Sequence, residues 1–148
     1  MPDWPALAPG ATIGILGGGQ LGRMMALAAA ELGLKCHIYC PEAESPAFDV
    51  AAASTCASYE DMDALDRFAG VIDCATIEFE NLPLAALDRL ARQVPMRPGS
   101  GSLKITQDRL EERQFLEGIG AAVAPFMAIN TAGDARAWDF SAGRAVLK

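Results

Sequence analysis

Short apolar runs alternate along the chain with segments whose apolar residues recur at helical spacing. Three of these runs are typical of buried parallel strands, at residues 12–16 (TIGIL), 35–40 (KCHIYC) and 71–77 (VIDCATI). Helical patterns follow them, at residues 21–32, 61–68 and 84–93. Small residues at 49–57 are ambiguous, and they are compatible with a short helix followed by a strand.

This alternation predicts an α/β fold. Strands and helices take turns four times within about ninety residues, which favours a parallel sheet with right-handed crossovers. We expect one compact domain over residues 1–98.

Residues 96–102 (MRPGSGS) change the pattern, because proline, glycine and serine dominate there and predict a linker or a domain junction. A charged helix at 103–117, strands at 123–129 and 144–148, and a helical turn or two at 131–140 are expected beyond it. About fifty residues of this kind are too few for an independent core, so residues 99–148 are expected to be only the first part of a second domain.

Composition excludes several classes of protein. The net charge is −7, and the absence of a run of Lys or Arg argues against nucleic acid or an anionic membrane surface as a partner. No basic and apolar leader opens the chain, and no apolar stretch is long enough for a membrane span. The four Cys form no C-x-x-C pair, so we expect no metal site, reduced thiols and a cytoplasmic protein.

A glycine fingerprint, G-x-G-x-x-G, begins at Gly17 directly after the first predicted strand and opens the first helix. Glycines there permit a tight turn and close approach of the backbone to a ligand, and the helix terminus favours an anion. We expect an anion or substrate site at this turn. The alternative is that the glycines only let the strand and helix pack closely.

An NAD(P)-binding oxidoreductase domain is the alternative function that this fingerprint suggests. That function calls for an acidic residue at the end of the second strand, but the strand ends in Cys40 and Pro41, and Glu42 comes two places late. The single histidine, His37, lies inside a predicted strand, where it is more often packed than catalytic. These residues therefore argue against an oxidoreductase and favour a different function for the glycine turn.

A second candidate cluster, IEFENLP (77–83), follows the third apolar run. Glu78 and Glu80 are two residues apart, so both carboxylates face one side if the chain is extended. They come at the carboxyl end of a parallel strand, the same sheet edge as the glycine turn, where ligands bind in such folds. The alternative is that both are solvated loop acids.

Three stretches together resemble the N5-carboxyaminoimidazole ribonucleotide synthetases, also known as the ATPase subunit of phosphoribosylaminoimidazole carboxylase. They are GGGQLGRM (17–24), ATIEFEN (75–81) and QDRLEERQFLEGIGAAVAPF (107–126). The resemblance runs in order from about Thr12 to Lys148. It implies a Rossmann-like preATP-grasp domain followed by the start of an ATP-grasp domain.

The resemblance also implies an activity. In these ligases of purine synthesis, ATP phosphorylates bicarbonate to carboxyphosphate, and aminoimidazole ribonucleotide takes the carboxyl group on its amine. The family implies Mg²⁺ and a homodimer. Its metal ligands and phosphate loop are expected outside these 148 residues, so this portion alone is expected to be inactive.

Site residues follow from the same resemblance. Arg109 and Lys148 match positions that contact ATP, although Arg109 could instead pair with Glu112 on its helix and Lys148 could be an ordinary chain-end lysine. No catalytic residue is assigned in this chain. The residues implied for the substrate side are Gly18, Gly19, Gln20, Leu21, Glu78 and Glu80.

Overall fold

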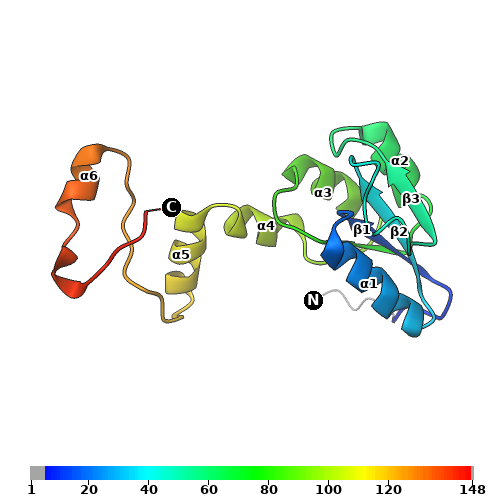
Figure 1. The fold of residues 1–148 in the computed structure, drawn as a ribbon, viewed down its shortest axis with the longest axis horizontal. Helices are drawn as coiled ribbons and strands as arrows, with labels where there is room; N and C mark the ends of the chain where they lie inside the picture. The colour runs from blue at the N-terminus through cyan, green and yellow to red at the C-terminus, as the bar shows by residue number, and fades with distance from the viewer. Residues whose placement is uncertain (1–5, 148) are drawn as a thin grey trace. The chain divides into compact units, whose positions relative to one another are not determined.

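The structure, a computed structural model, describes residues 6–147 and divides into two compact units. The first ends at Leu103 and the second begins at Lys104 (Figure 1). The first unit therefore extends five residues beyond residue 98, where the sequence predicts the boundary.

A sheet of four parallel strands forms the centre of the first unit, in the order β3-β2-β1-β4. Their bounds are β1 Thr12–Leu16, β2 Lys35–Cys40, β3 Ala53–Cys56 and β4 Cys74–Ile77. The predicted parallel α/β fold is confirmed. The third apolar run is only partly a strand, because residues 71–73 form a turn and a bend before β4.

Local sequence sets where the helices of this unit begin and end. Asp61 caps the second helix by accepting the Ala64 N–H at 2.9 Å, and Gly33 ends the first helix with a positive φ of 73°. The helices are α1 Gln20–Glu31, α2 Met62–Ala69 and α3 Leu84–Ala91, together with the beginning of α4 Ser100–Thr106, which continues past Leu103 into the second unit.

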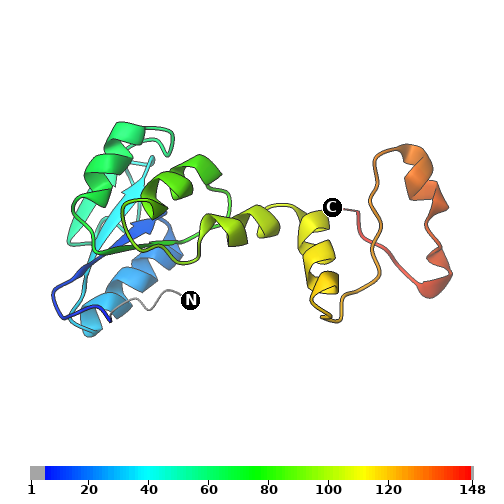
Figure 2. The same cartoon turned by 180° about the vertical axis from the view of Figure 1, so that it is seen from behind.

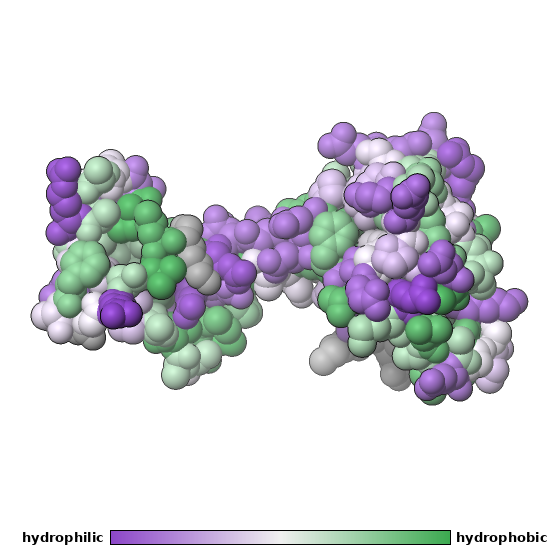
Figure 3. All heavy atoms as spheres, in the orientation of Figure 1, coloured by the Kyte–Doolittle hydropathy of each residue, from purple (hydrophilic) through white to green (hydrophobic). Residues whose placement is uncertain are grey.

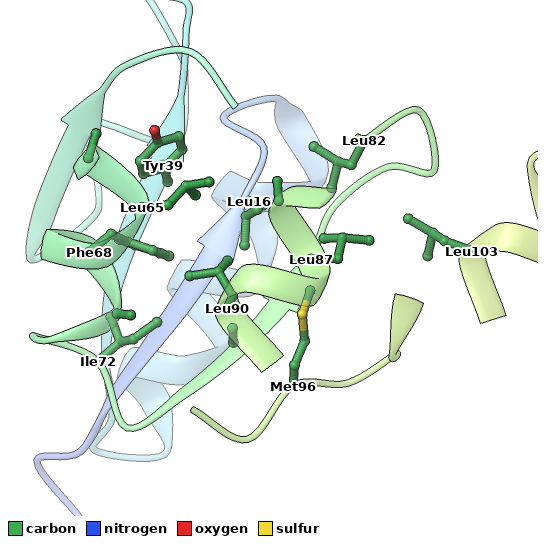
Figure 4. Close-up of a cluster of buried hydrophobic side chains, with 14 residues drawn as sticks. Leu16, Tyr39, Leu65, Phe68, Ile72, Leu82, Leu87, Leu90, Met96 and Leu103 are labelled. Atoms are coloured by element: carbon green, nitrogen blue, oxygen red, sulfur yellow. The ribbon is translucent and has the colours of Figure 1, made fainter. Parts of the chain in front are cut away.

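Two hydrophobic cores lie on opposite faces of the sheet because successive strand residues point to opposite sides. Ile15 packs in the core with α1 residues such as Ala26, whereas Leu16 packs in the core with α2 and α3 residues such as Phe68 and Leu87. Figure 4 shows the larger of these cores, and Figure 2 gives the view from behind. The first unit is thus a three-layer α/β/α arrangement.

Of the two alternatives predicted for residues 96–102, the linker is wrong, whereas a domain junction stays a prediction. Met96 is 5% exposed and forms a parallel bridge with Ala75 beside β4, and Ser100 begins α4. Leu103 of α4 is also buried in the larger core. The proline, glycine and serine residues between them make a turn inside the folded unit.

The second unit contains α5 (Arg109–Gly118), α6 (Ala132–Ala137) and a short 3₁₀ helix, Phe140–Ala142. The single helix predicted at 103–117 is two helices, because Asp108 adopts an extended conformation and caps α5 by accepting the N–H groups of Leu110 and Glu111. The helical turn predicted at 131–140 is confirmed in α6, which begins with a capping box.

The strands predicted at 123–129 and 144–148 are wrong as far as the structure describes them. Residues 121–130 and 143–147 have no regular secondary structure, and Lys148 lies outside the described residues. An apolar run forms a strand only with a neighbouring strand that completes its hydrogen bonds, and no strand is present within residues 104–147. Within residues 6–147, no helix has the length and apolar character that crossing a membrane requires.

Candidate functional site

The glycine turn, residues 17–19, connects the end of β1 to the start of α1 at the carboxyl edge of the sheet. Gly17 has a φ of 118°, a conformation that L side chains rarely adopt, and its N–H donates to the Tyr39 carbonyl at 2.9 Å. Gly19 is the N-cap of α1 and has an ordinary φ of −76°. Backbone conformation therefore requires glycine at Gly17 only.

Glu78 lies directly against the glycine turn. Its backbone N–H donates to the Leu16 carbonyl at 2.9 Å, and its Oε2 accepts a long hydrogen bond of 3.4 Å from the Gly19 N–H. A Cβ on Gly17 or Gly19 would lie 2.5 Å from a carboxylate oxygen of Glu78. These two glycines thus make room for Glu78, and the prediction that the turn and Glu78 share one sheet edge is confirmed.

Gly22, the last glycine of the fingerprint, and Gly18, which stands between its first two, also face protein atoms. A Cβ on Gly18 would lie 2.5 Å from the Cys40 Sγ and 2.6 Å from Ser45, and one on Gly22 would lie 2.8 Å from the Gly17 carbonyl oxygen. Contacts inside the chain therefore account for every glycine of the fingerprint, and close packing of strand and helix is part of what these glycines do.

Aromatic side chains border the carboxylate. Phe79, 38% exposed, would touch a Cβ on Gly17 at 3.1 Å, and its ring lies 6.0 Å from that of Tyr59. Burial raises the pKa of Tyr59, and negative neighbours, including Glu42 and Glu78, raise it further. Sequence analysis did not single out Phe79 and Tyr59, although Phe79 stands between the two predicted glutamates and could have been included on that ground.

Of the six residues predicted for the substrate side, the structure brings Gly19 and Glu78 into contact. Gly18, Gln20 and Leu21 are the neighbours of Gly19 in the turn and the start of α1. Leu21 is 57% exposed at the start of α1. Glu80 is exposed two residues beyond Glu78. Binding of substrate by these residues stays a prediction.

Arg109 is the first residue of α5, in the second unit, and its Nη1 lies 2.9 Å from the Glu112 carboxylate. This is the surface ion pair that sequence analysis weighed as the alternative, so an ATP contact for Arg109 stays a prediction. Lys148, the other predicted ATP contact, lies outside the described residues.

His37 is packed, as its place in a strand predicts. It is 9% exposed, its Nε2 lies 2.8 Å from the Thr55 hydroxyl, and its ring meets Phe68 edge-on at 5.0 Å. Burial lowers the pKa of His37. The four cysteines are free thiols, and no group of three or more His, Cys, Asp or Glu residues within 6–147 is placed to hold a metal ion.

The Glu78 carboxylate limits which chemical groups of a ligand can bind at the glycine turn. In a dinucleotide site the helix N-terminus faces a pyrophosphate. Here a carboxylate already lies beside the Gly19 N–H at the α1 N-terminus, and a phosphate in the same place would be repelled by it. The arrangement instead suits groups that donate hydrogen bonds to a carboxylate, such as hydroxyls or amines.

The strand order 3-2-1-4 and the glycine turn after the first strand define a Rossmann-like α/β domain whose turn holds a carboxylate rather than a dinucleotide phosphate. The chain belongs to the ribonucleotide synthetase preATP-grasp domain family, whose model matches residues 10–107. The predicted resemblance is confirmed by the relatives.

One relative is the N5-carboxyaminoimidazole ribonucleotide synthase of Brucella melitensis, 45% identical over 128 residues, a match that covers 86% of this chain and 35% of the relative. Among solved structures, the Staphylococcus aureus N5-carboxyaminoimidazole synthetase complexed with ADP matches at a TM-score of 0.85 with 36% identity. That match covers 91% of this chain and 36% of the other.

A further solved structure is the N5-carboxyaminoimidazole synthase of Aspergillus clavatus in complex with ADP and 5-aminoimidazole ribonucleotide. It matches at a TM-score of 0.70 with 26% identity, over 79% of this chain and 31% of that chain. This chain therefore spans about a third of the length of these relatives.

Proposed function

We propose that this chain is part of an N5-carboxyaminoimidazole ribonucleotide synthetase. The enzyme would use ATP to convert bicarbonate to carboxyphosphate and would transfer the carboxyl group to the amine of aminoimidazole ribonucleotide. The observation that carries the proposal is the Glu78 carboxylate against the glycine turn, in a chain of this family. Residues 104–148 would be the start of the ATP-grasp domain.

Within that enzyme, the glycine turn and Glu78 would bind the ribonucleotide. The Glu78 carboxylate would accept hydrogen bonds from ribose hydroxyls or the exocyclic amine, while the phosphate of the ribonucleotide would be held away from this negative charge. Gly18, Gly19, Gln20 and Leu21 would form the adjoining wall. Glu80, exposed on the same loop, would contribute at its margin.

Arg109 and Lys148 would contact ATP, and Mg²⁺ would neutralise the charge that develops on its phosphates. The ligands for Mg²⁺ would come from the remainder of a longer protein, as the family resemblance implies. We expect the 148-residue chain alone to lack carboxylation-coupled ATPase activity. We also propose that the enzyme is a cytoplasmic homodimer.

The test varies Glu78 in the complete enzyme of which this chain would be a part. Glu78→Gln keeps the size of the side chain and removes its charge, so the KM for aminoimidazole ribonucleotide should rise while the KM for ATP changes little. Steady-state phosphate release, with each substrate varied in turn, measures both constants, and Glu60→Gln, an exposed acid ahead of α2, is the matched control. A wild-type enzyme without ribonucleotide-dependent phosphate release would disprove the proposed function.

Titration of the ¹⁵N-labelled chain with NADH and with the ribonucleotide separates this proposal from the oxidoreductase. We expect the amide signals of residues 17–20 to shift with the ribonucleotide and to stay in place with NADH. The opposite result would support an oxidoreductase domain.

A further inference from the structure

The connection between β2 and β3, residues 41–52, crosses from one parallel strand to the next without a helix. A connection of this kind is held in place by contacts other than its own secondary structure. Ala47 lies in its middle, 0% exposed, and donates its N–H to the Gly18 carbonyl at 3.0 Å. The connection is thus bonded directly to the glycine turn.

A second set of contacts fixes the beginning of the connection beneath the same glycine. The Ser45 hydroxyl donates to the Glu42 carbonyl at 2.8 Å and lies 2.9 Å from the Cys40 thiol. Both Cys40 and Ser45 occupy the space that a side chain on Gly18 would need. Gly18 therefore lies between α1 on one side and the 41–49 segment on the other, and a shift of that segment would move the turn.

Arg23 joins the segment to α1 from the outside. Its Nη1 donates to the Pro46 carbonyl at 2.9 Å and lies 3.3 Å from the Asp49 carboxylate. The Asp49 side chain is 75% exposed and that of Arg23 is 32% exposed, so the ion pair is screened by solvent and contributes little. The charge-assisted bond to the Pro46 carbonyl, one residue before Ala47, is the stronger anchor.

We propose that Arg23 is a positioning residue for ribonucleotide binding: it holds the 41–49 segment against Gly18 and so sets the shape of the glycine turn. This rests on the proposed function. Arg23 itself would not touch the substrate. Its effect passes through the Pro46 carbonyl and the Ala47–Gly18 hydrogen bond, which lie between it and the turn.

The test combines a structural readout on the chain with kinetics of the complete enzyme. In Arg23→Ala, hydrogen exchange of the Ala47 amide should accelerate. The KM for the ribonucleotide should rise by about fivefold, the change expected from the loss of one hydrogen bond. The KM for ATP should stay within about twofold, because the change is made in the first unit whereas the predicted ATP contacts, Arg109 and Lys148, belong to the second. Arg23→Lys should restore most of the binding, and Asp49→Ala should resemble the wild type.

Arg92→Ala, which removes an exposed arginine at the end of α3, is the matched control and should change neither readout. Unchanged exchange of the Ala47 amide in Arg23→Ala would disprove the anchor. Faster exchange with an unchanged KM for the ribonucleotide would disprove the positioning role. If the wild-type enzyme showed no ribonucleotide-dependent activity, both the proposed function and the positioning role of Arg23 would be disproved. The hydrogen-exchange data would still show whether Arg23 holds the 41–49 segment in place.

Discussion

The two units of the chain contain similar apolar runs but use them differently. In the first unit, TIGIL at 12–16 is β1, with β2 on one side and β4 on the other, and its last two residues are at most 1% exposed. In the second, the comparable run at 123–129 has no regular structure, and α5 contains no buried residue. Phe115, Ile119 and Phe140 are between 47% and 63% exposed there, and Figure 3 shows apolar side chains at the surface of this unit.

An apolar run is therefore not enough to form a buried strand or helix, because it also needs a partner against which to pack. A strand needs neighbours for its N–H and C=O groups, and a helix needs a surface for its apolar side. The first unit supplies both from its own residues. The chain matches only about a third of the length of its relatives. In the proposed enzyme, the rest of the protein would supply the neighbouring strands and the packing surface that the described residues of the second unit lack.

The largest effect should separate a buried phenylalanine from an exposed one. Phe68 is 1% exposed in the larger core, whereas Phe115 is 47% exposed on α5. Phe68→Ala should lower the free energy of unfolding by about 3–5 kcal/mol, and Phe115→Ala by less than about 1 kcal/mol. Urea unfolding of the two variants measures both values. Equal losses would show that the second unit has a core comparable to that of the first.

A pair of glycines extends the comparison to the backbone. Gly18→Ala places a Cβ within 2.6 Å of Cys40 and Ser45, whereas Gly118→Ala meets nothing within 4 Å at the end of α5. The first change should destabilise by about 1–3 kcal/mol through overpacking. The second should be neutral or stabilise by up to about 1 kcal/mol, because alanine favours the helix. The denaturant midpoints of the two variants measure both effects. A Gly18→Ala variant as stable as the wild type would contradict the tight packing at the turn.

Between pH 7.5 and 5, the stability of the first unit should depend on pH more than that of the second. The reason is that His37, the only histidine of the chain, lies in the first unit. Burial lowers the pKa of His37 below its usual 6.5 in the folded state, so the unfolded chain binds the proton more readily. The stabilisation is complete above the unfolded value and is lost as the pH falls below about 6.5. Melting temperatures between pH 7.5 and 5 should show this slope in the wild type, and a slope that persists in His37→Gln would assign it to other groups.

The smallest effects concern surface charges in the two units. The Arg89 guanidinium, followed by the Gln93 amide, lowers the pKa of Asp66, in a paired contact that joins α3 to α2. Asp66→Asn should lower the free energy of unfolding slightly, and by more than Glu112→Gln, which breaks a pair within α5. Chemical unfolding in low salt resolves the difference, and high salt should diminish it. A larger loss for Glu112→Gln would reverse the ranking.

Sequence predicted the parts of the fold that depend on local pattern. The strands at 12–16 and 35–40 have the predicted bounds because each is a short, largely apolar run between turn residues. The linker at 96–102 was wrong because its composition is that of a turn, whereas the burial of Met96 and its bridge to Ala75 depend on β4 being nearby. Such a tertiary contact has no periodic signal.

The site was predicted in outline only. That two motifs follow parallel strands is enough to place the glycine turn and Glu78 at one edge. It does not show that Glu78 fills the space beside Gly17 and Gly19, or that Ser45 lies under Gly18. Those contacts depend on the path of residues 41–52, whose turn-rich sequence has no regular period.

The carboxylate beside the α1 N-terminus has a consequence for inhibitor chemistry. A phosphate or a phosphate mimic is the group that suits an ordinary glycine-rich turn at a helix N-terminus. Here a compound with such a group would meet Glu78, whereas an uncharged polyol or a protonated amine would gain a hydrogen bond from it. Selectivity against dinucleotide-binding dehydrogenases would then follow from the sign of the charge on the inhibitor, without any difference in the shape of the turn.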